Sequence, residues 1–139
     1  MKYKLVVFDM DGTILRERTI FKLAEEMGFK DKLLKIMNQD VESYKKSVEI
    51  ARLLKCTSVS RFMEIFKKIH LQENMEYVLK RLREMGIKTA IITNSYQLAA
   101  NHLKDILHID YAYSNELVIK DDHITGDIIM NNKKLTKRF

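Results

Sequence analysis

Apolar positions along the chain follow two different periods, and these periods predict most of the elements. Residues 3–8 form a short, valine-rich apolar run that ends at a polar turn, which is typical of a buried strand. Between about 19 and 71 the apolar residues recur at helical spacing, which predicts four successive helices. Thr19, Asp31 and Ser60 are candidate N-caps for three of them. The first half of the chain is therefore predicted to be one strand followed by an all-helical stretch.

The second half of the chain alternates between helical and strand patterns. We expect these elements at about 73–85 (helix), 88–93 (strand), 96–107 (helix), 110–113 (strand), and 116–120 and 124–130 (the arms of a hairpin). Such an alternation favours parallel strands. The predicted fold class is therefore α/β. An incomplete Rossmann-like parallel-sheet core (1–14 and 72–139) carries an inserted all-helical cap (15–71).

Composition and charge narrow the classes of protein that remain. Hydrophobic residues make up 46% of the chain and charged residues 32%, a globular mixture that excludes wholesale disorder. No apolar run approaches the ~20 residues needed to span a membrane. The single cysteine, Cys56, cannot form an internal disulfide and favours a cytoplasmic location. Most of the +6 net charge lies in 15–71, as a solvated helical surface or as a surface that attracts an anionic ligand. Nucleic acid is not a favoured partner, because the sequence has no zinc finger, RNP-type motif or aromatic-basic repeat.

The polar residues that end the first strand carry the clearest chemical signal. The string Phe8-Asp9-Met10-Asp11-Gly12-Thr13 places two carboxylates at the C-terminal end of a strand, the edge where open α/β sheets bind ligands. Two neighbouring carboxylates push their pKa values apart, so that one can act as nucleophile and the other as proton donor. Gly12 permits a backbone excursion that a side chain would block. The alternative interpretation is a simple strand-to-turn ending, where Asp and Gly are common.

The same string resembles the first motif of the haloacid dehalogenase superfamily, whose phosphatases have Asp-x-Asp-x-Thr/Val there. Ile91-Ile92-Thr93-Asn94 resembles the second motif, a strand that ends in Ser or Thr. The helical insert resembles the cap that phosphoserine-phosphatase-like members carry after the first motif. Ser114-Asn115-Glu116-Leu117, followed by Ile124-Thr125-Gly126-Asp127, is similar to a short Asn-containing turn before a hairpin in that subgroup.

This resemblance implies a Mg²⁺-dependent phosphatase that acts on a small phosphorylated metabolite, for which serine phosphate is one candidate. Asp9 would attack the phosphorus and form an aspartyl-phosphate. Asp11 would protonate the leaving alcohol and later deprotonate the hydrolytic water. The Asp9 carboxylate and the Asp11 backbone carbonyl would hold Mg²⁺. Thr93, Asn94 and Gly12 would bind the phosphoryl group.

The sequence offers candidates for the third motif of the superfamily and no counterpart of the fourth. The third is a lysine near the start of a late helix, where Lys134 is preferred over Lys133 and Lys137, with a basic solvated helix start as the alternative. The fourth, an acidic loop that completes the Mg²⁺ site, has no counterpart after Lys134. We therefore expect a truncated gene product or a fragment that binds Mg²⁺ weakly, with an exposed sheet edge that allows self-association. The alternative function is a catalytically incompetent remnant that binds a partner or phosphate without turnover.

Two positions near the start of the cap are open to different interpretations. Glu17 and Arg18 lie where related serine-specific phosphatases use a cap glutamate to hold the substrate ammonium, and the spacing does not decide which residue falls there. Arg16, Arg18 or Arg52 could instead meet a second anionic group, with a surface position as the favoured alternative for each.

Overall fold

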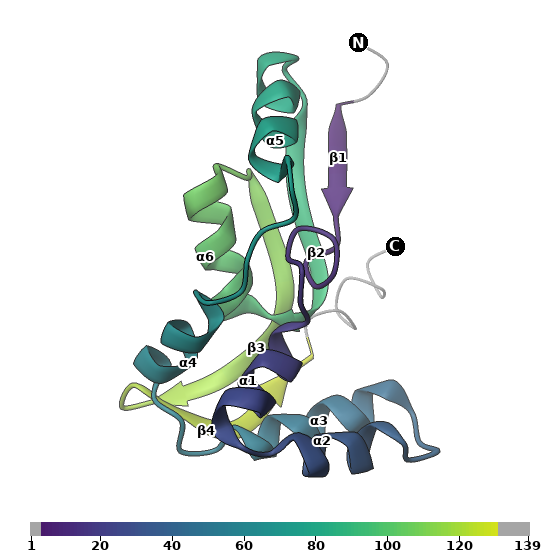
Figure 1. Cartoon of the computed structure of the whole chain (residues 1–139), viewed down its shortest axis with the longest axis vertical. Helices are drawn as coiled ribbons and strands as arrows, with labels where there is room; N and C mark the ends of the chain where they lie inside the picture. The colour runs from purple at the N-terminus through teal and green to yellow at the C-terminus, as the bar shows by residue number, and fades with distance from the viewer. Residues whose placement is uncertain (1–3, 131–139) are drawn as a thin grey trace.

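A four-stranded sheet runs along the molecule (Figure 1). Its last two strands meet a group of helices at one end, and two further helices flank it toward the other end (Figure 1). The computed structural model describes residues 4–130. The strands, in the order in which they lie in the sheet, are β1 (Leu5–Phe8), β2 (Lys88–Tyr96), β3 (Tyr111–Lys120) and β4 (His123–Ile129). The first three are parallel, as the βα alternation predicts, and β4 is antiparallel to β3.

Strand β3 is longer than the sequence pattern predicts. Its first part pairs with β2, and its second part continues past the end of that ladder and pairs with β4. The expected turn at Asn115 is therefore wrong: this residue is fully buried inside the strand, and its Nδ2 donates to the Asn94 carbonyl at 3.0 Å. The expected hairpin turn is correct in place, because Asp121 and Asp122 both have positive φ (51° and 61°), as a type I′ turn requires.

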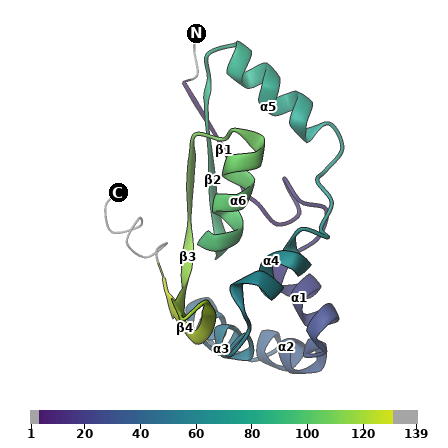
Figure 2. The ribbon, with the colours of Figure 1, turned by 90° about the vertical axis from the view of Figure 1, so that its left-hand side faces the viewer.

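The two faces of the sheet differ in what covers them. Helices α5 (Met75–Glu84) and α6 (Gln97–Leu107) lie against one face, as Figure 2 shows. On the other face, apolar side chains of the described strands stay exposed, among them Val7 (50%), Ile92 (43%) and Tyr113 (46%). Strand β1 lies at the edge of the described sheet. Self-association at this edge stays a prediction.

All four helices predicted between the first strand and residue 71 are present. They are α1 (Thr19–Met27), α2 (Lys30–Met37), α3 (Ser43–Leu53) and α4 (Val59–Phe66). Their expected N-caps are wrong. The cap of α4 is Ser58, whose Oγ accepts from the Arg61 N–H at 3.0 Å. Thr19 and Asp31 lie inside the first turns of α1 and α2. The residues before α1 and α2 are Arg18 and Phe29, and neither makes a side-chain cap hydrogen bond.

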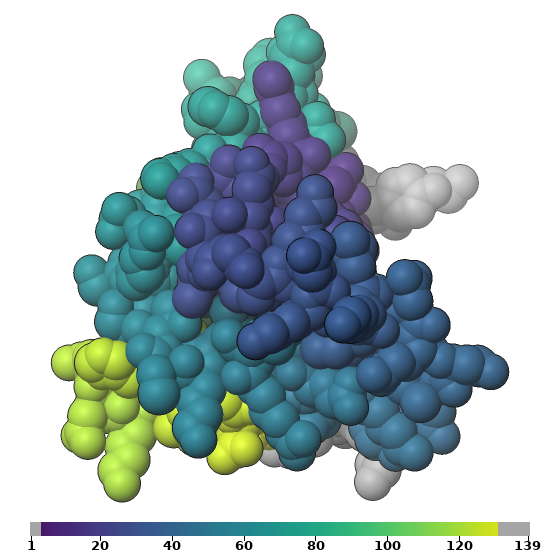
Figure 3. Space-filling view, turned by 60° about the horizontal axis from the view of Figure 1, so that its bottom comes forward, coloured from purple at the N-terminus to yellow at the C-terminus, as the bar shows by residue number. Residues whose placement is uncertain are grey.

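The helical segment contacts the sheet through the β3–β4 hairpin. In the α3–α4 connection, the Cys56 N–H donates to the Ile124 carbonyl at 2.8 Å, and the Ile124 N–H donates to the Thr57 carbonyl at 2.8 Å. Figure 3 shows the helices, in blue and teal, beside the yellow hairpin on the same surface. The division of the chain into a core and a cap stays a prediction.

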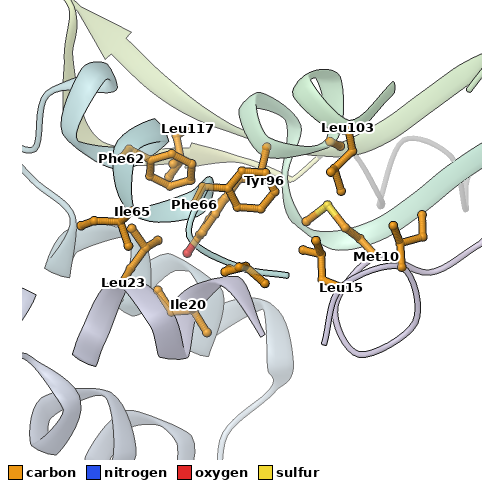
Figure 4. Packing of buried hydrophobic residues seen from close by; sticks show 14 of the residues in the cluster. Met10, Leu15, Ile20, Leu23, Phe62, Ile65, Phe66, Tyr96, Leu103 and Leu117 are labelled. Atoms are coloured by element: carbon orange, nitrogen blue, oxygen red, sulfur yellow. The ribbon is translucent and has the colours of Figure 1, made fainter. Parts of the chain in front are cut away.

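A single group of buried apolar side chains joins the helices to the sheet. Figure 4 shows Phe62 of α4 against Tyr96 at the end of β2, with ring centroids 5.9 Å apart and the planes at 73°. Leu23 of α1 and Leu103 of α6 belong to the same cluster. The helices are therefore held in place by the same core as the sheet. None of the helices among residues 4–130 is long and apolar enough to cross a membrane.

Candidate active site

The loop after β1 is a tight turn built around one buried side chain. Met10 is fully buried, and its carbonyl accepts the N–H groups of Ile14 at 3.1 Å and Leu15 at 3.0 Å. Gly12 has φ +78°, a conformation that L side chains rarely adopt. Anchoring Met10 inward leaves the residues on either side of it, Asp9 and Asp11, to border the cavity beyond the strand end.

Asp9 and Asp11 have different surroundings. Asp9 is exposed, and its Oδ1 accepts the Met10 N–H at 2.8 Å. Asp11 is half-buried, and its Oδ1 accepts both the hydroxyl of Thr19 at 2.7 Å and the Thr19 N–H at 3.1 Å. Asp9 and Asp11 are the same residue type, but their carboxylates lie in different electrostatic environments.

Burial raises the pKa of Asp11 above its ordinary value of 3.8, and the charge of Asp9 adds to the rise. The two Thr19 hydrogen bonds and the charge of Arg18 act in the opposite direction and do not cancel it. Asp11 therefore keeps its proton to a higher pH than an exposed aspartate. A carboxyl group of this kind suits proton donation.

The C-terminal part of β2, from Ile92 to Tyr96, continues past the end of β1. The two strands are parallel and in register, with Phe8 opposite Ile91, so their carboxyl ends meet at one edge. Thr93 is buried, and its Oγ1 accepts the Ser95 N–H at 3.2 Å. Asn115 of β3 holds the Asn94 carbonyl from the neighbouring strand. These contacts fix the last part of β2, where its register with β3 shifts between Ile92 and Tyr96.

A cavity of about 410 Å³ lies at this edge, between the strand ends and the helices. One side, here called the core wall, consists of Asp9, Asp11, Thr93, Asn94, Ser95 and Tyr96. The other side, here called the helical wall, consists of Arg18, Ile20, Met37, Ser43, Lys46, Ser47 and Ile50. Ile128 of β4 completes the lining. The volume is in the range of small-molecule sites.

Four of the residues that the sequence assigns to a site border this one cavity: Asp9, Asp11, Thr93 and Asn94. Gly12 is not among the lining residues, and its carbonyl accepts from the Gln72 side chain at 3.3 Å. Lys133, Lys134 and Lys137 lie outside the described residues.

Apart from Arg18, which the sequence offered as one of three arginines for a second anionic group, sequence reasoning missed the helical wall. Lys46, Ser43 and Ser47 of α3 belong to no recognisable motif. The excess positive charge of 15–71 was the only sequence signal for Lys46, and the two serines had none. Arg18 borders the cavity, whereas Glu17 does not. Arg16 donates its Nε to the Leu71 carbonyl at 2.9 Å, and Arg52 is exposed outside the cavity. A folded structure is needed to sort such charges into lining and surface.

The donor set at the strand end fits Mg²⁺ in kind. Mg²⁺ prefers oxygen ligands and is commonly held by one or two carboxylates, with waters and substrate phosphate in the other positions. The Asp9 carboxylate and the Asp11 backbone carbonyl are oxygen donors of this kind. Among residues 4–130 no group of three or more His, Cys, Asp and Glu side chains could hold a metal ion. Any Mg²⁺ held by this part of the chain alone would therefore depend on few protein ligands.

Comparison with known proteins identifies the family. The family of haloacid dehalogenase-like hydrolases matches residues 6–137. The chain belongs to this family. The α/β fold and the resemblance stated from the two motifs are thereby confirmed.

Individual members of the haloacid dehalogenase-like family agree with this assignment. A phosphoserine phosphatase of Methanocaldococcus jannaschii is 31% identical over 131 residues, which cover 91% of this chain and 62% of that protein. A haloacid dehalogenase family hydrolase of Salmonella enterica superposes with a TM-score of 0.90 at 26% identity, over 97% of this chain and 50% of the other. A substrate-bound phosphoserine phosphatase superposes with a TM-score of 0.84 at 27% identity, over 99% and 71%. The chain thus spans 62% of the length of the first of these relatives.

Proposed function

We propose that this haloacid dehalogenase-like chain hydrolyses a small phosphomonoester through a phosphorylated Asp9. The observation that carries the proposal is the convergence of Asp9, Asp11 and Thr93 on one cavity, with the pKa of Asp11 raised by burial. The phosphoserine phosphatases among its relatives support a small organic phosphate as the substrate.

In the first half-reaction, Asp9 is the nucleophile. One oxygen of its carboxylate attacks the phosphorus opposite the ester oxygen, a new O–P bond forms, and the ester O–P bond breaks. Burial raises the pKa of Asp11 and so favours its protonated form, which gives the proton to the departing alkoxide. The products are the free alcohol and phosphorylated Asp9.

In the second half-reaction, Asp11 acts as the base. Now ionised, it removes a proton from a water molecule, which attacks the phosphorus and releases inorganic phosphate and the Asp9 carboxylate. Thr93 holds the phosphoryl group in both halves. Its Oγ1 accepts the Ser95 N–H, which leaves the hydroxyl proton to donate to a phosphoryl oxygen.

A carboxylate and a phosphate dianion repel each other, so the reaction needs positive charge at the site. We propose that the Asp9 carboxylate and the Asp11 backbone carbonyl hold Mg²⁺, which neutralises charge on the nucleophile and the phosphoryl oxygens when bound. Arg18 and Lys46 add positive field from the helical wall. The exposed, single Cys56 is consistent with action in the cytoplasm.

The rival proposal, a remnant that binds phosphate without turnover, is less well supported. Loss of function commonly removes the reacting groups first, whereas Asp9, Asp11 and Thr93 are all present and line the same cavity.

Hydrolysis of p-nitrophenyl phosphate by the full chain with Mg²⁺ tests the proposed function. We expect turnover that Asp9→Asn abolishes, because an amide is not a nucleophile for phosphorus. Rapid acid quenching followed by mass spectrometry should show a phosphorylated peptide that contains Asp9. The matched control is Asp105→Asn, which neutralises an exposed acid of α6 outside the cavity and should leave turnover unchanged. A folded chain without turnover, or an active Asp9→Asn variant, would favour the remnant.

A further inference from the structure

Two positively charged side chains face the cavity from the helical wall. Arg18 comes directly before α1, and Lys46 lies in the first half of α3. Both line the same cavity as Asp9 and Asp11. The direct contacts proposed above for the reacting phosphoryl group come from the core wall. Arg18 and Lys46 contribute only their positive field there, so their N–H donors are available for another part of the substrate.

Neither cation has its charge neutralised by an ion pair within residues 4–130. The half-buried Lys46 donates to the Met37 carbonyl at 2.9 Å, which leaves two of its three N–H donors for a ligand. Arg18 lies over the Phe21 ring, with its guanidinium carbon 5.0 Å from the ring centroid. Stacking of this kind orients a guanidinium without occupying its N–H donors.

The helical wall contains no carboxylate. Asp9 and Asp11, both on the core wall, are the only acids among the described residues that line the cavity. A substrate ammonium on the helical side would therefore meet two like charges and no partner. A substrate carboxylate or phosphate there would meet two hydrogen-bonding cations.

We propose that the substrate carries, besides its phosphomonoester, a second anionic group without an ammonium next to it, and that Arg18 and Lys46 bind this anion. The proposal rests on the proposed function and deepens it. Ile20, Met37 and Ile50, which line the same wall, contact the carbon skeleton between the two anionic ends. The cavity of about 410 Å³ suits a compact phosphorylated acid or bisphosphate.

Binding of a matched set of ligands tests this proposal without relying on turnover. The full chain with the Asp9→Asn substitution is titrated by calorimetry in the presence of Mg²⁺. The ligands are 3-phosphoglycerate, O-phosphoserine (an ammonium in place of the 2-hydroxyl) and glycerol 3-phosphate (a hydroxymethyl group in place of the carboxylate). Propane-1,3-diol bisphosphate tests a phosphate as the second anion. We expect 3-phosphoglycerate or the bisphosphate to bind about tenfold or more tightly than O-phosphoserine and glycerol 3-phosphate.

Substitutions at the two cations then assign the preference to named residues. Arg18→Gln and Lys46→Gln should each remove most of the preference for the second anion, because they remove the charge and keep a polar, flexible side chain. The control is Lys45→Gln, the preceding residue of α3, which is exposed and does not line the cavity. It should keep the full preference. Circular dichroism checks that each variant is folded.

The outcomes separate this proposal from the proposed function. If p-nitrophenyl phosphate is hydrolysed but O-phosphoserine binds as tightly as 3-phosphoglycerate, the second-anion proposal is wrong and the hydrolase stands. If the anion preference holds without hydrolysis of any ester, the binding proposal stands and the catalytic one is wrong. An undiminished preference in both Arg18→Gln and Lys46→Gln, or no binding of either 3-phosphoglycerate or the bisphosphate, also overturns it.

Discussion

The two walls of the cavity differ in origin, in charge and in how they are built. The core wall comes from the ends of two adjacent parallel strands and presents carboxylates and small polar groups. The helical wall comes from α1, α3 and the end of α2, and presents two cations, two hydroxyls and apolar side chains. In the proposed reaction the core wall makes and breaks bonds, whereas the helical wall recognises the rest of the substrate.

This difference indicates that residues which select the substrate can change independently of residues at the proposed reacting centre. Strand ends in register hold their residues at fixed separations, which a reacting centre requires. Helices that pack on the core through side chains can change their cavity-facing residues without disturbing the sheet. Thr19 is the exception, because it belongs to α1 and yet holds the Asp11 carboxylate of the core wall. The two walls are thus coupled through one hydrogen-bonded pair and one apolar cluster.

Among substitutions that test the different roles of the two walls, Asp11→Asn on the core wall should have the largest effect. The amide cannot donate or accept the proton in the two half-reactions, so kcat should fall by about 10²- to 10⁴-fold for every substrate. Steady-state kinetics on two esters of different leaving-group pKa measures this loss. The loss should be smaller for the p-nitrophenyl ester, whose leaving group needs less protonation.

The same variant should be more stable than the native chain at neutral pH. The pKa of Asp11 is raised in the folded state, so the native form binds more protons than the unfolded one above pH 3.8, and stability falls as the pH rises through that window. Asn removes the ionisation and still accepts from Thr19 through its amide oxygen. A thermal unfolding temperature that drops in Asp11→Asn at pH 7 would contradict this account.

A second test breaks the packing that joins the two walls. Phe62 of α4 is fully buried and meets Tyr96 of the core wall edge to face. Phe62→Ala should lower the free energy of unfolding by about 3–5 kcal/mol, through the cavity left behind and the lost ring contact. Urea denaturation measures this change, and Phe62→Leu, which keeps most of the volume, should cost less. Separate transitions for helices and sheet in the native chain would show that the two walls do not share one core.

The smallest effect is expected where the helical wall tunes the core wall. Thr19→Val removes the 2.7 Å hydrogen bond that lowers the pKa of Asp11, so that pKa should rise further. Because Asp11 acts as an acid while protonated, the basic limb of the kcat profile should move to higher pH. The lost hydrogen bond should cost about 1 kcal/mol of stability. Thr19→Ser keeps the hydroxyl and should keep the native profile; an unchanged limb in Thr19→Val would show that another proton donor acts.

Much of the core wall could be predicted from the sequence because its residues are local. Asp9 and Asp11 lie within one turn at a strand end, and Thr93 lies in the neighbouring strand just past the ladder with β1, so the motif and the period place them. The sequence pattern predicted a turn at Asn115, whereas β3 continues through it. Its side chain donates to the carbonyl of Asn94, a residue distant in sequence, and local sequence does not show such a contact. The expected cap of α1 was wrong because Thr19 lies inside the helix and uses its hydroxyl on Asp11.

The sequence by itself determined which segments are strands and helices, and where the carboxylates of Asp9 and Asp11 are placed. The spacing of apolar residues and the residue types of turns are set within a few residues. An apolar face can therefore be recognised before it is known which element covers it. Only the tertiary structure decided that Arg18 and Lys46 face those carboxylates while Arg16, Lys45 and Arg52 do not. Which charges line the cavity depends on how the helices pack through long-range contacts around Phe62 and Tyr96. The local sequence around a charged helix residue does not show which residues it will lie beside in the fold.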